Sequence, residues 1–418
     1  MNTFFTSESV SEGHPDKVSD QISDAILDNY LAFDSESKVA CETLVTTNKV
    51  IVAGEVKSNA QINVEKIIRE TIEKIGYTDS KVKFSANECE VSSLIHSQSE
   101  DINRGVERSM KENQGAGDQG IMFGYATEET ENLIPLTLDL SHKILKELSN
   151  LRRQGNQIGY LRPDSKSQVT VEYDKNGNPV SIDTILVSTQ HDPFEKDDKR
   201  MVDKIKKDIV EILLPRVFDN EHKNIRSLYN KNTKIIINPT GKFVIGGPHG
   251  DTGLTGRKII VDTYGGWGAH GGGAFSGKDP SKVDRSAAYA SRYIAKNLVA
   301  SGIASKILVQ LSYAIGIAEP TSINVNTFGT SKFKLTNSEI TEMIYNIFDL
   351  RPYSIEKSLA LRNPIYFETS SYGHMGRDHK KINKVFLNKN NEKVNHQVEL
   401  FTWENLNYVQ KINNYLNK

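Results

Sequence analysis

The sequence predicts an α+β protein with three pseudo-threefold-related domains, each an antiparallel sheet with helices on one face. Two observations predict this class. The pattern helix, strand, strand, helix occurs three times, and 418 residues are too many for one ordinary core. The predicted units are residues 1–101, 115–232 and 233–380, with approximate boundaries and segments that can be interleaved, followed by a Lys/Asn-rich extension at 381–418.

Hydrophobic periodicity locates the elements of each unit. The first unit is predicted to contain helices at about 16–31 and 63–75, with strands at 39–46 and 49–57 between them. The second is predicted to contain helices at about 139–153 and 197–213, with strands at 168–173 and 180–189 between them. The third is predicted to contain helices at about 280–300 and 338–349, with strands at 306–315 and 321–328 between them.

Local signals support these boundaries. Gly76 and Gly155 follow two of the predicted helices, as residues that end a helix often do. Asp174–Gly177 is a strong hairpin turn, and Thr336–Glu339 is a capping box. The extension is expected to begin with a solvated loop or insertion at Lys380–Asn395 and to end in an amphipathic segment at about 403–416.

The composition is that of a soluble globular protein, with 25% charged and 37% hydrophobic residues. A net charge of −1 provides no basic field, so neither nucleic acid nor a membrane is an expected partner. The N-terminal residues lack the pattern of a signal peptide, and no apolar run approaches the ~20 residues that span a bilayer. Cys41 and Cys89 lie in strand-like apolar segments, which favours a reduced, cytoplasmic location.

One glycine-rich stretch carries the strongest chemical signal. Seven glycines lie between Gly265 and Gly277, and Lys278, Lys282 and Asp284 follow. Glycine lets a backbone approach a bulky anion and turn its N–H groups toward it, and the start of a helix also favours anions. The stretch therefore predicts a polyphosphate site with a metal, and the alternative is a flexible linker.

The same stretch nearly matches a P-loop but departs from it at one residue. Gly272, Gly277 and Lys278 fit the pattern, whereas Asp279 stands where Ser or Thr would bind magnesium. Pro280 follows, so Asp279 is interpreted as a helix N-cap. We therefore reject an ordinary P-loop NTPase and keep the phosphate prediction.

Four further segments carry chemistry-bearing residues. Gly13–Lys17 offers a histidine, an acid and a lysine at the start of a helix, although Asp16 can serve as a cap only. Gly246–Lys258 ends in adjacent Arg257 and Lys258, which suits phosphate oxygens; a tight structural loop is the alternative. Arg162–Gln168 and Gly115–Gly120 add acids and a base, and a purely structural turn remains open for each. His96, His142 and His191 show no metal-ligand spacing.

These segments resemble the S-adenosylmethionine synthetase (methionine adenosyltransferase) family. The resemblance runs from about Thr6 to Arg377, and the family's motifs match at Phe5–Lys17, Gly115–Gly120, Arg162–Gln168, Gly253–Lys258 and Gly271–Asp284. It implies a three-domain, pseudo-threefold fold. It also implies attack of methionine sulfur on C5′ of ATP, followed by hydrolysis of the triphosphate to pyrophosphate and phosphate. Glu195–Lys234 and the C-terminal extension depart from the family, and Phe401–Glu404 resembles a family terminus displaced by an insertion.

The resemblance implies a role for each matching residue. The implied catalytic residues are His14, Lys166, Arg257 and Lys278. The implied ATP contacts are His14, Asp164, Lys166, Lys242, Phe243 (stacked on adenine), Asp251, Arg257, Lys258, Ala274 (through its backbone) and Lys278. The implied methionine contacts are Glu55, Gln98, Asp118, Asp251 and Lys282. Two Mg²⁺ per site and one K⁺ per subunit are implied, with Asp16 and Asp284 as magnesium ligands and Glu42 as the potassium ligand.

The resemblance also implies an assembly and a lid. ATP and L-methionine are the expected partners, in a homodimer with active sites at the subunit interface or in a tetramer built as a dimer of dimers. Residues 98–108 match the family's mobile loop over the site, and their polarity fits a lid. Two alternatives remain at this point, namely another ATP enzyme, such as a ligase or small-molecule kinase, and a non-catalytic nucleotide-binding regulator.

Overall fold

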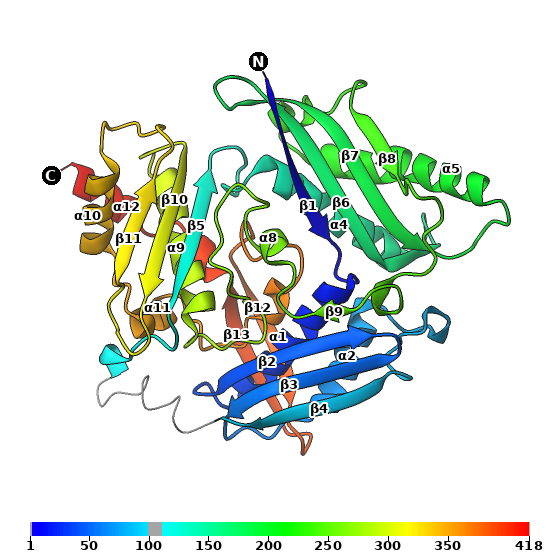
Figure 1. The fold of residues 1–418 in the computed structure, drawn as a ribbon, viewed down its shortest axis with the longest axis horizontal. Helices are drawn as coiled ribbons and strands as arrows, with labels where there is room; N and C mark the ends of the chain where they lie inside the picture. The colour runs from blue at the N-terminus through cyan, green and yellow to red at the C-terminus, as the bar shows by residue number, and fades with distance from the viewer. Residues whose placement is uncertain (1, 99–110, 418) are drawn as a thin grey trace.

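Three sheets covered by helices, together with one separate hairpin, make up the fold of this computed structural model (Figure 1). The structure describes residues 2–98 and 111–417. Two of the sheets have four strands and the third has three. Over the described ranges, no helix combines the length and the apolar character required to cross a bilayer.

The first sheet has the strand order β4-β3-β2-β9. Its strands are β2 (Lys38–Thr46), β3 (Lys49–Lys57), β4 (Glu90–Ser97) and the short β9 (Gly253–Leu254). Helices α1 (Pro15–Phe33) and α2 (Val64–Ile75) pack on it, and Gly76 ends α2 in the left-handed conformation as predicted. β9 pairs with β2 and thereby pins the 253–258 loop beside the start of α1.

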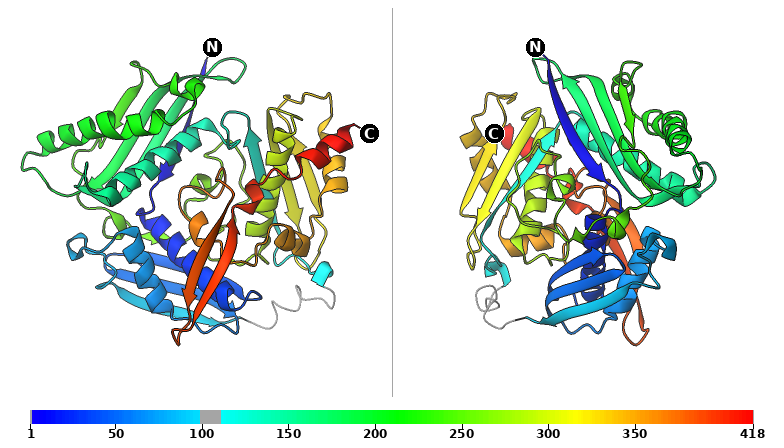
Figure 2. Two further views of the ribbon diagram at one scale, coloured as in Figure 1. Left: turned by 180° about the vertical axis from the view of Figure 1, so that it is seen from behind. Right: turned by 45° about the vertical axis from the view of Figure 1, so that its right-hand side comes forward.

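The second sheet has the order β1-β6-β7-β8. Its strands are β1 (Thr3–Val10), β6 (Leu161–Tyr173), β7 (Pro179–His191) and β8 (Lys234–Ile237). Seen from behind in Figure 2, α4 (Leu136–Gln154) and α5 (Asp198–Asp208) cover one face. The predicted helix at 197–213 consists of α5 and a π-helical turn (Ile209–Leu213). α6 (Leu214–Phe218) follows it directly, and α7 (Lys223–Arg226) follows after a turn.

The third sheet has the order β11-β10-β5. Its strands are β5 (Gly120–Thr127), β10 (Lys306–Tyr313) and β11 (Ser322–Asn326). Helices α9 (Val283–Ala300) and α10 (Asn337–Ile347) pack on it, and the predicted capping box at Thr336 is present. Short helix α8 (Ile259–Asp262) contacts β1, and short helix α11 (Pro352–Ser358) contacts α9.

The α+β class with antiparallel-rich sheets is confirmed, but two strand pairs run parallel. β4 joins β3, and β8 joins β7, in parallel register. In both cases helices intervene between the two strands, and a helical crossover brings the chain back in the same direction. The chain also exchanges strands between units, because β1 lies beside β6 and β9 lies beside β2.

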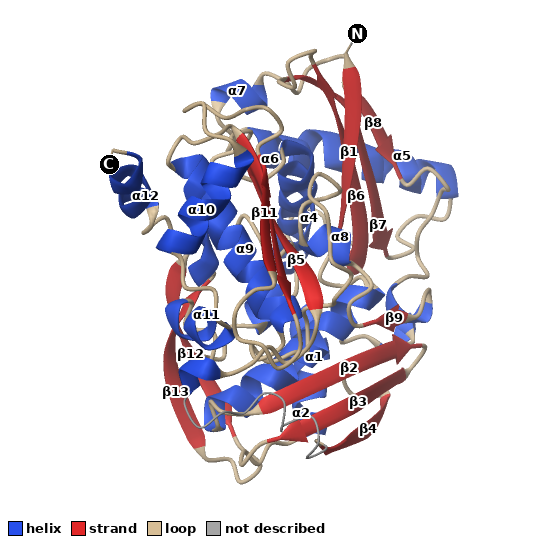
Figure 3. Cartoon of the chain, turned by 60° about the vertical axis from the view of Figure 1, so that its left-hand side comes forward, coloured by secondary structure: helices blue, strands red, loops and turns tan. Residues whose placement is uncertain are grey.

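Two local predictions are wrong. Lys380–Asn395 is not a solvated loop: it forms most of a hairpin of β12 (Lys380–Leu387) and β13 (Lys393–Leu400), which Figure 3 shows beside α1. Its alternating pattern buries Phe386 and the stem of Lys384, which the lysine content concealed. Asp279 is not the N-cap of α9, since the helix begins at Val283 and Lys282 is its N-cap.

The C-terminal segment packs on α9. Trp403 is fully buried and stacks on Tyr289, with ring centroids 3.7 Å apart. Glu404 is paired with Arg292 at 2.9 Å and with Lys296 at 2.7 Å, and α12 (Val409–Leu416) follows. The tail therefore supports the helix whose N-terminal turn carries Asp284.

Candidate active site

His14 caps the first helix and is held in one tautomer. It is the N-cap of α1, and its Nδ1 accepts the backbone N–H of Asp16 at 3.2 Å. That contact places the ring proton on Nε2. Burial, then the charges of Lys258 and Lys166, lower the pKa of His14 to about 3, so the ring is neutral at pH 7. His14 thus offers a neutral N–H donor at the start of a helix.

Asp16 gathers the cations of the 253–258 loop. Its Oδ1 accepts the N–H of Leu254 at 3.0 Å, and its Oδ2 contacts Lys258 Nζ at 2.5 Å. Arg257 Nε lies 3.6 Å from Oδ1. Burial raises the pKa of Asp16, but the hydrogen bonds from Lys258 and Leu254 outweigh burial and hold the pKa below its usual value. Asp16 is therefore an ionised carboxylate flanked by two cations.

Strand β6 adds an acid and a lysine beside this helix start. The register pairs Val10 with Lys166, so the chain leaves β1 next to residues 164–166 just before it reaches His14. Asp164 is buried; its Oδ2 accepts the N–H of Gly247 at 2.8 Å, while its Oδ1 has no partner among the described residues. Burial raises the pKa of Asp164 to about 6. An unpaired buried carboxylate oxygen indicates that a donor, such as a substrate group, completes the site.

Phe243 lies next to this group, and Lys242 points elsewhere. Phe243 and His191 exchange two hydrogen bonds, from Phe243 N to His191 Nε2 at 2.9 Å and from His191 N to Phe243 O at 3.0 Å. A Cβ at Gly246 would lie 2.8 Å from the Phe243 ring, so glycine at this position lets the ring approach the loop closely. Lys242 is 56% exposed and pairs with Asp198 at 2.9 Å.

The remaining predicted cations and acids surround the start of α9. Lys278 Nζ lies 2.7 Å from Asp284, and Lys282 pairs with Asp279. The side chain of Ala274 meets Gly256, so the 271–277 loop packs against the 253–258 loop. The Gly115–Gly120 loop also reaches this place, because a Cβ at its Gly117 would lie 2.8 Å from the carbonyl oxygen of residue 281. Asp118 on that loop is exposed, and its Oδ1 accepts the N–H of Gln119 at 2.7 Å.

The sheet of β2 and β3 carries the other predicted methionine and potassium residues. Ala40 of β2 forms an isolated bridge with Lys278 and lies opposite Glu55 of β3. Glu42 is exposed two residues beyond Ala40 on the same face of β2. Gln98 follows β4, and its buried Oε1 has no partner among the described residues. These residues border the α9 loops rather than the start of α1.

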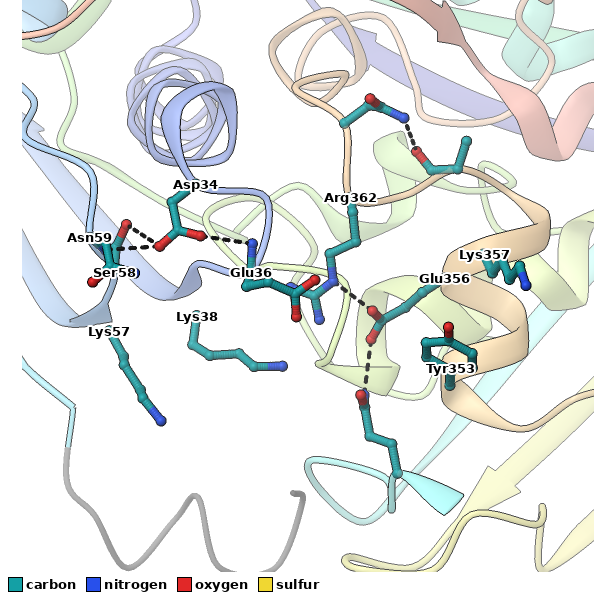
Figure 4. A pocket seen from close by; sticks show the side chains of 13 residues that line it. Asp34, Glu36, Lys38, Lys57, Ser58, Asn59, Tyr353, Glu356, Lys357 and Arg362 are labelled. Atoms are coloured by element: carbon teal, nitrogen blue, oxygen red, sulfur yellow. Dashed lines mark hydrogen bonds and ion pairs between the residues drawn. The ribbon is translucent and has the colours of Figure 1, made fainter. Parts of the chain in front are cut away.

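A charged cavity of about 820 Å³ opens beside these residues (Figure 4). Lys38 and Lys57 enter it from facing positions of β2 and β3, as Figure 4 shows. Burial, followed by the charge of Arg362, lowers the pKa of Lys38. Glu356 closes the far side by accepting hydrogen bonds from Arg362 at 2.6 Å and Gln114 at 3.1 Å.

The structure divides the predicted residues into two groups. The α1 group contains His14, Asp16, Asp164, Lys166, Asp251, Arg257 and Lys258, which lie together with Phe243 alongside. The α9 group contains Glu42, Glu55, Gln98, Asp118, Ala274, Lys278, Lys282 and Asp284. Within residues 2–98 and 111–417, no hydrogen bond or ion pair joins a side chain of one group to a side chain of the other. The predicted lid at 98–108 lies outside the described residues except for Gln98.

Sequence reasoning missed the residues that hold these loops in place. Asp20 accepts the N–H of Gly256 at 2.8 Å, and Asp24 accepts that of Gly277 at 2.8 Å. The signal was visible as a row of aspartates at intervals of four, Asp16, Asp20, Asp24 and Asp28, which places them on one helix face. Buried aspartates on a helix require partners, but apolar periodicity predicts only the apolar face of this helix to be buried.

Two comparisons, with family models and with individual relatives, place this chain among known proteins. The family models of S-adenosylmethionine synthetase match it as N-terminal domain (residues 2–100), central domain (113–243) and C-terminal domain (245–384). An S-adenosylmethionine synthase of Christiangramia forsetii is 64% identical over 412 residues, covering 99% of this chain and 98% of the relative. The S-adenosylmethionine synthases of Flavobacterium johnsoniae and Cytophaga hutchinsonii are each 63% identical over 99% of this chain, covering 99% and 98% of the relatives. This chain belongs to the S-adenosylmethionine synthetase family.

Proposed function

We propose that this protein is a methionine adenosyltransferase that forms S-adenosylmethionine from ATP and L-methionine. The methionine sulfur attacks C5′ of ATP and expels triphosphate, and water then cleaves the triphosphate to pyrophosphate and phosphate. Full-length similarity to S-adenosylmethionine synthases supports the activity. The α1 group carries the proposal for this chain, because a neutral N–H donor and three cations surround one buried helix start.

That arrangement suits a step without a general base. A thioether sulfur attacks as a neutral nucleophile, so no proton has to leave it. The barrier lies in aligning sulfur, carbon and leaving oxygen and in stabilising the charge that grows on the triphosphate. His14 Nε2–H can donate to the departing oxygen, while Lys166, Arg257 and Lys258 neutralise the phosphates. Phe243 supplies an aromatic face for adenine.

The α9 group supplies the second half of the proposed site. Lys278 and the backbone at Ala274 contact the triphosphate, and Asp118, Glu55, Gln98 and Lys282 hold methionine. Gln98 supports this assignment because its buried Oε1 lacks a partner among the described residues and can accept from a substrate amino group. Asp251 of the α1 group contacts both substrates.

The carboxylates present fit magnesium bound mainly through substrate oxygens. Within the described part of the chain, no three His, Cys, Asp or Glu side chains cluster as a ready metal site. Mg²⁺ typically uses one or two carboxylates together with phosphate oxygens. Asp16 and Asp284 are each ligands of that kind, and we assign two Mg²⁺ to each site and one K⁺ per subunit to Glu42. Bound Mg²⁺ would offset the charge of the triphosphate, whereas the side chains of the α1 and α9 groups align the substrates and His14 donates a hydrogen bond to the departing oxygen.

The division into two groups supports a shared site in a homodimer. In one chain the two groups have no side-chain bond in common among the described residues, yet the chemistry requires both at one ATP. We therefore assign the α1 group of one subunit and the α9 group of its partner to each site. We propose a cytoplasmic location for this dimer or dimer of dimers.

Product identification tests the function. The protein is incubated with ATP, methionine, Mg²⁺ and K⁺, and the products are identified by mass spectrometry and phosphate analysis. S-adenosylmethionine, pyrophosphate and phosphate are expected in equal amounts. ADP or AMP without a sulfonium product would instead indicate a kinase or ligase.

A further inference from the structure

The aspartate row of α1 ties together segments that are far apart in the sequence. Asp16, Asp20, Asp24 and Asp28 are each at most 1% exposed. Each accepts at least one backbone N–H from another segment, and the donors in order are Leu254, Gly256, Gly277 and the pair Tyr366 and Phe367. Each also contacts at least one cation, and the nearest are, in order, Lys258, Lys17, Arg285 and Lys384. One helix face therefore fixes both glycine-rich loops.

Asp24 and Arg285 fix the backbone around Lys278. Asp24 Oδ1 accepts Gly277 N at 2.8 Å and Arg285 Nη1 at 2.7 Å, and its Oδ2 accepts Arg285 Nη2 at 2.8 Å. Arg285 Nη1 also lies 3.3 Å from the carbonyl oxygen of Lys278, and the carbonyl oxygen of Gly277 accepts Cys41 N at 3.0 Å. Both peptide groups that flank Lys278 are thus held by buried partners.

The chain conformation at this point leaves little freedom. Gly277 has φ 80°, and an added Cβ would lie 1.8 Å from the carbonyl oxygen of Cys41. Arg285 is fully buried and donates to Tyr289 and Thr369 as well. Asp24 and Arg285 therefore hold the backbone around Lys278 in one conformation, from which the Lys278 side chain extends to Asp284.

We propose that Asp24, acting through Gly277 and Arg285, is a positioning residue that sets the location of the Lys278 ammonium. It touches no substrate; its effect on the reaction passes through Lys278. This role rests on the proposed function, in which Lys278 contacts the triphosphate. A misplacement of about 1 Å at a reacting centre can cost on the order of 10²-fold in rate.

Asp28 provides a matched control. It lies one turn further along the same helix face, is equally buried, and holds two backbone N–H groups and Lys384. The segments it holds, around Tyr366 and in β12, contain no predicted site residue. Asp28→Asn removes a comparable buried charge without reaching Lys278.

A double-mutant cycle tests the role. The rate of S-adenosylmethionine formation in a single turnover, at saturating substrates and per folded protein, is measured for wild type, Asp24→Asn and Asp28→Asn. Each substitution is then repeated in the Lys278→Ala background. Asp24→Asn is expected to slow the wild type on the order of 10²-fold and to add no further loss to Lys278→Ala, because residues that act through one group are non-additive. Asp28→Asn is expected to stay near its parent rate in both backgrounds.

Each outcome decides the matter. An equal loss from Asp24→Asn in both backgrounds, or an equal loss from Asp28→Asn, would overturn the positioning role in favour of general structural support. If Asp24→Asn does not fold, Arg285→Lys takes its place, since it keeps the charge but loses the fork that reaches Lys278 O. If wild type and Asp28→Asn form no sulfonium product, the proposed function fails and this role falls with it.

Discussion

The α1 group and the α9 group differ in how much of their chemistry one chain encloses. His14 and Asp16 are 2% and 1% exposed, and Asp16 is already paired with Lys258 and Arg257. Asp118 and Glu42 of the α9 group are exposed, and Glu55 and Lys282 are only partly covered. Displacement of triphosphate is favoured when bulk solvent is kept away from the reacting sulfur and C5′. The difference indicates that one chain already encloses the start of α1, whereas the exposed residues of both groups, Lys166 and Asp251 among them, need a second surface to cover them.

The largest expected change in activity is its recovery when a subunit with a defect in the α1 group is paired with a subunit with a defect in the α9 group. Asp118→Asn and Lys166→Ala should each reduce activity by about 10²–10³-fold. A mixed dimer carrying one of each, purified by two different tags, should recover about half of wild-type activity because one of its two sites is intact. The homodimers of each variant, tagged in the same way, are the controls. A mixed dimer as inactive as its parents would place both groups in the same chain's site.

In the α1 group, His14 should affect the rate of sulfonium formation more than the affinity for ATP. Its Nε2–H donor is fixed by the bond from Asp16 N to Nδ1. Losing a donor used in the transition state typically costs about 10²–10³-fold in rate. His14→Ala should therefore slow single-turnover sulfonium formation by that factor with little change in Kd for ATP. His14→Asn, which keeps an N–H donor, should retain more activity. A collapse of ATP affinity with an unchanged chemical rate would make His14 a binding residue only.

The sequence was informative where a pattern is local and less so where partners are distant. Periodicity located α1, α2 and the hairpin of β6 and β7, because each depends on neighbouring residues. β1 and β9 were not predicted, because the strands with which they pair are more than 150 residues away in the sequence. The domain boundaries and site roles stay predictions.

The candidate site divides in the same way. The residue types in the Gly-His-Pro-Asp-Lys motif and in the glycine-rich loops are sufficient to predict a phosphate-binding site. Glu42 and Glu55 look like ordinary strand residues, and only the family resemblance singled them out. Asp24 could not be recognised because Gly277 and Arg285, its partners, are more than 250 residues along the chain.

The C-terminal tail should matter for stability of the α9 group. Glu404 is 3% exposed, and removing one partner of a buried ion pair typically costs about 3–5 kcal/mol. Burial raises the pKa of Glu404, but Arg292 and Lys296 outweigh burial and hold it below its usual value. Its contribution is therefore full above the unfolded pKa and is lost as the pH falls through the folded pKa. Glu404→Gln should lower the free energy of unfolding at pH 7 by that amount.

Denaturant titrations at several pH values measure this effect. The gap between wild type and Glu404→Gln should be constant at neutral pH and narrow in acid. Glu128→Gln is the matched control, because Glu128 pairs with Lys332 at 2.6 Å on the surface, and exposed pairs contribute about 0–1 kcal/mol. Equal losses from both variants would show that the tail does not brace α9.

The smallest change in ATP affinity is expected at the edge of the α1 group, where the neighbouring residues Lys242 and Phe243 should contribute differently. Lys242 is 56% exposed and pairs with Asp198, whereas Phe243 is fixed by His191 against the loop. Stacking on a base is worth about 1–3 kcal/mol, so Phe243→Ala should weaken ATP binding by about 5- to 150-fold. Lys242→Ala, which loses only an exposed ion pair, should change Kd less than ~3-fold. Calorimetric titration with Mg·ATP compares the two variants. An equal loss from Lys242→Ala would mean that this lysine leaves Asp198 to bind the nucleotide, and the α1 group would then extend to α5.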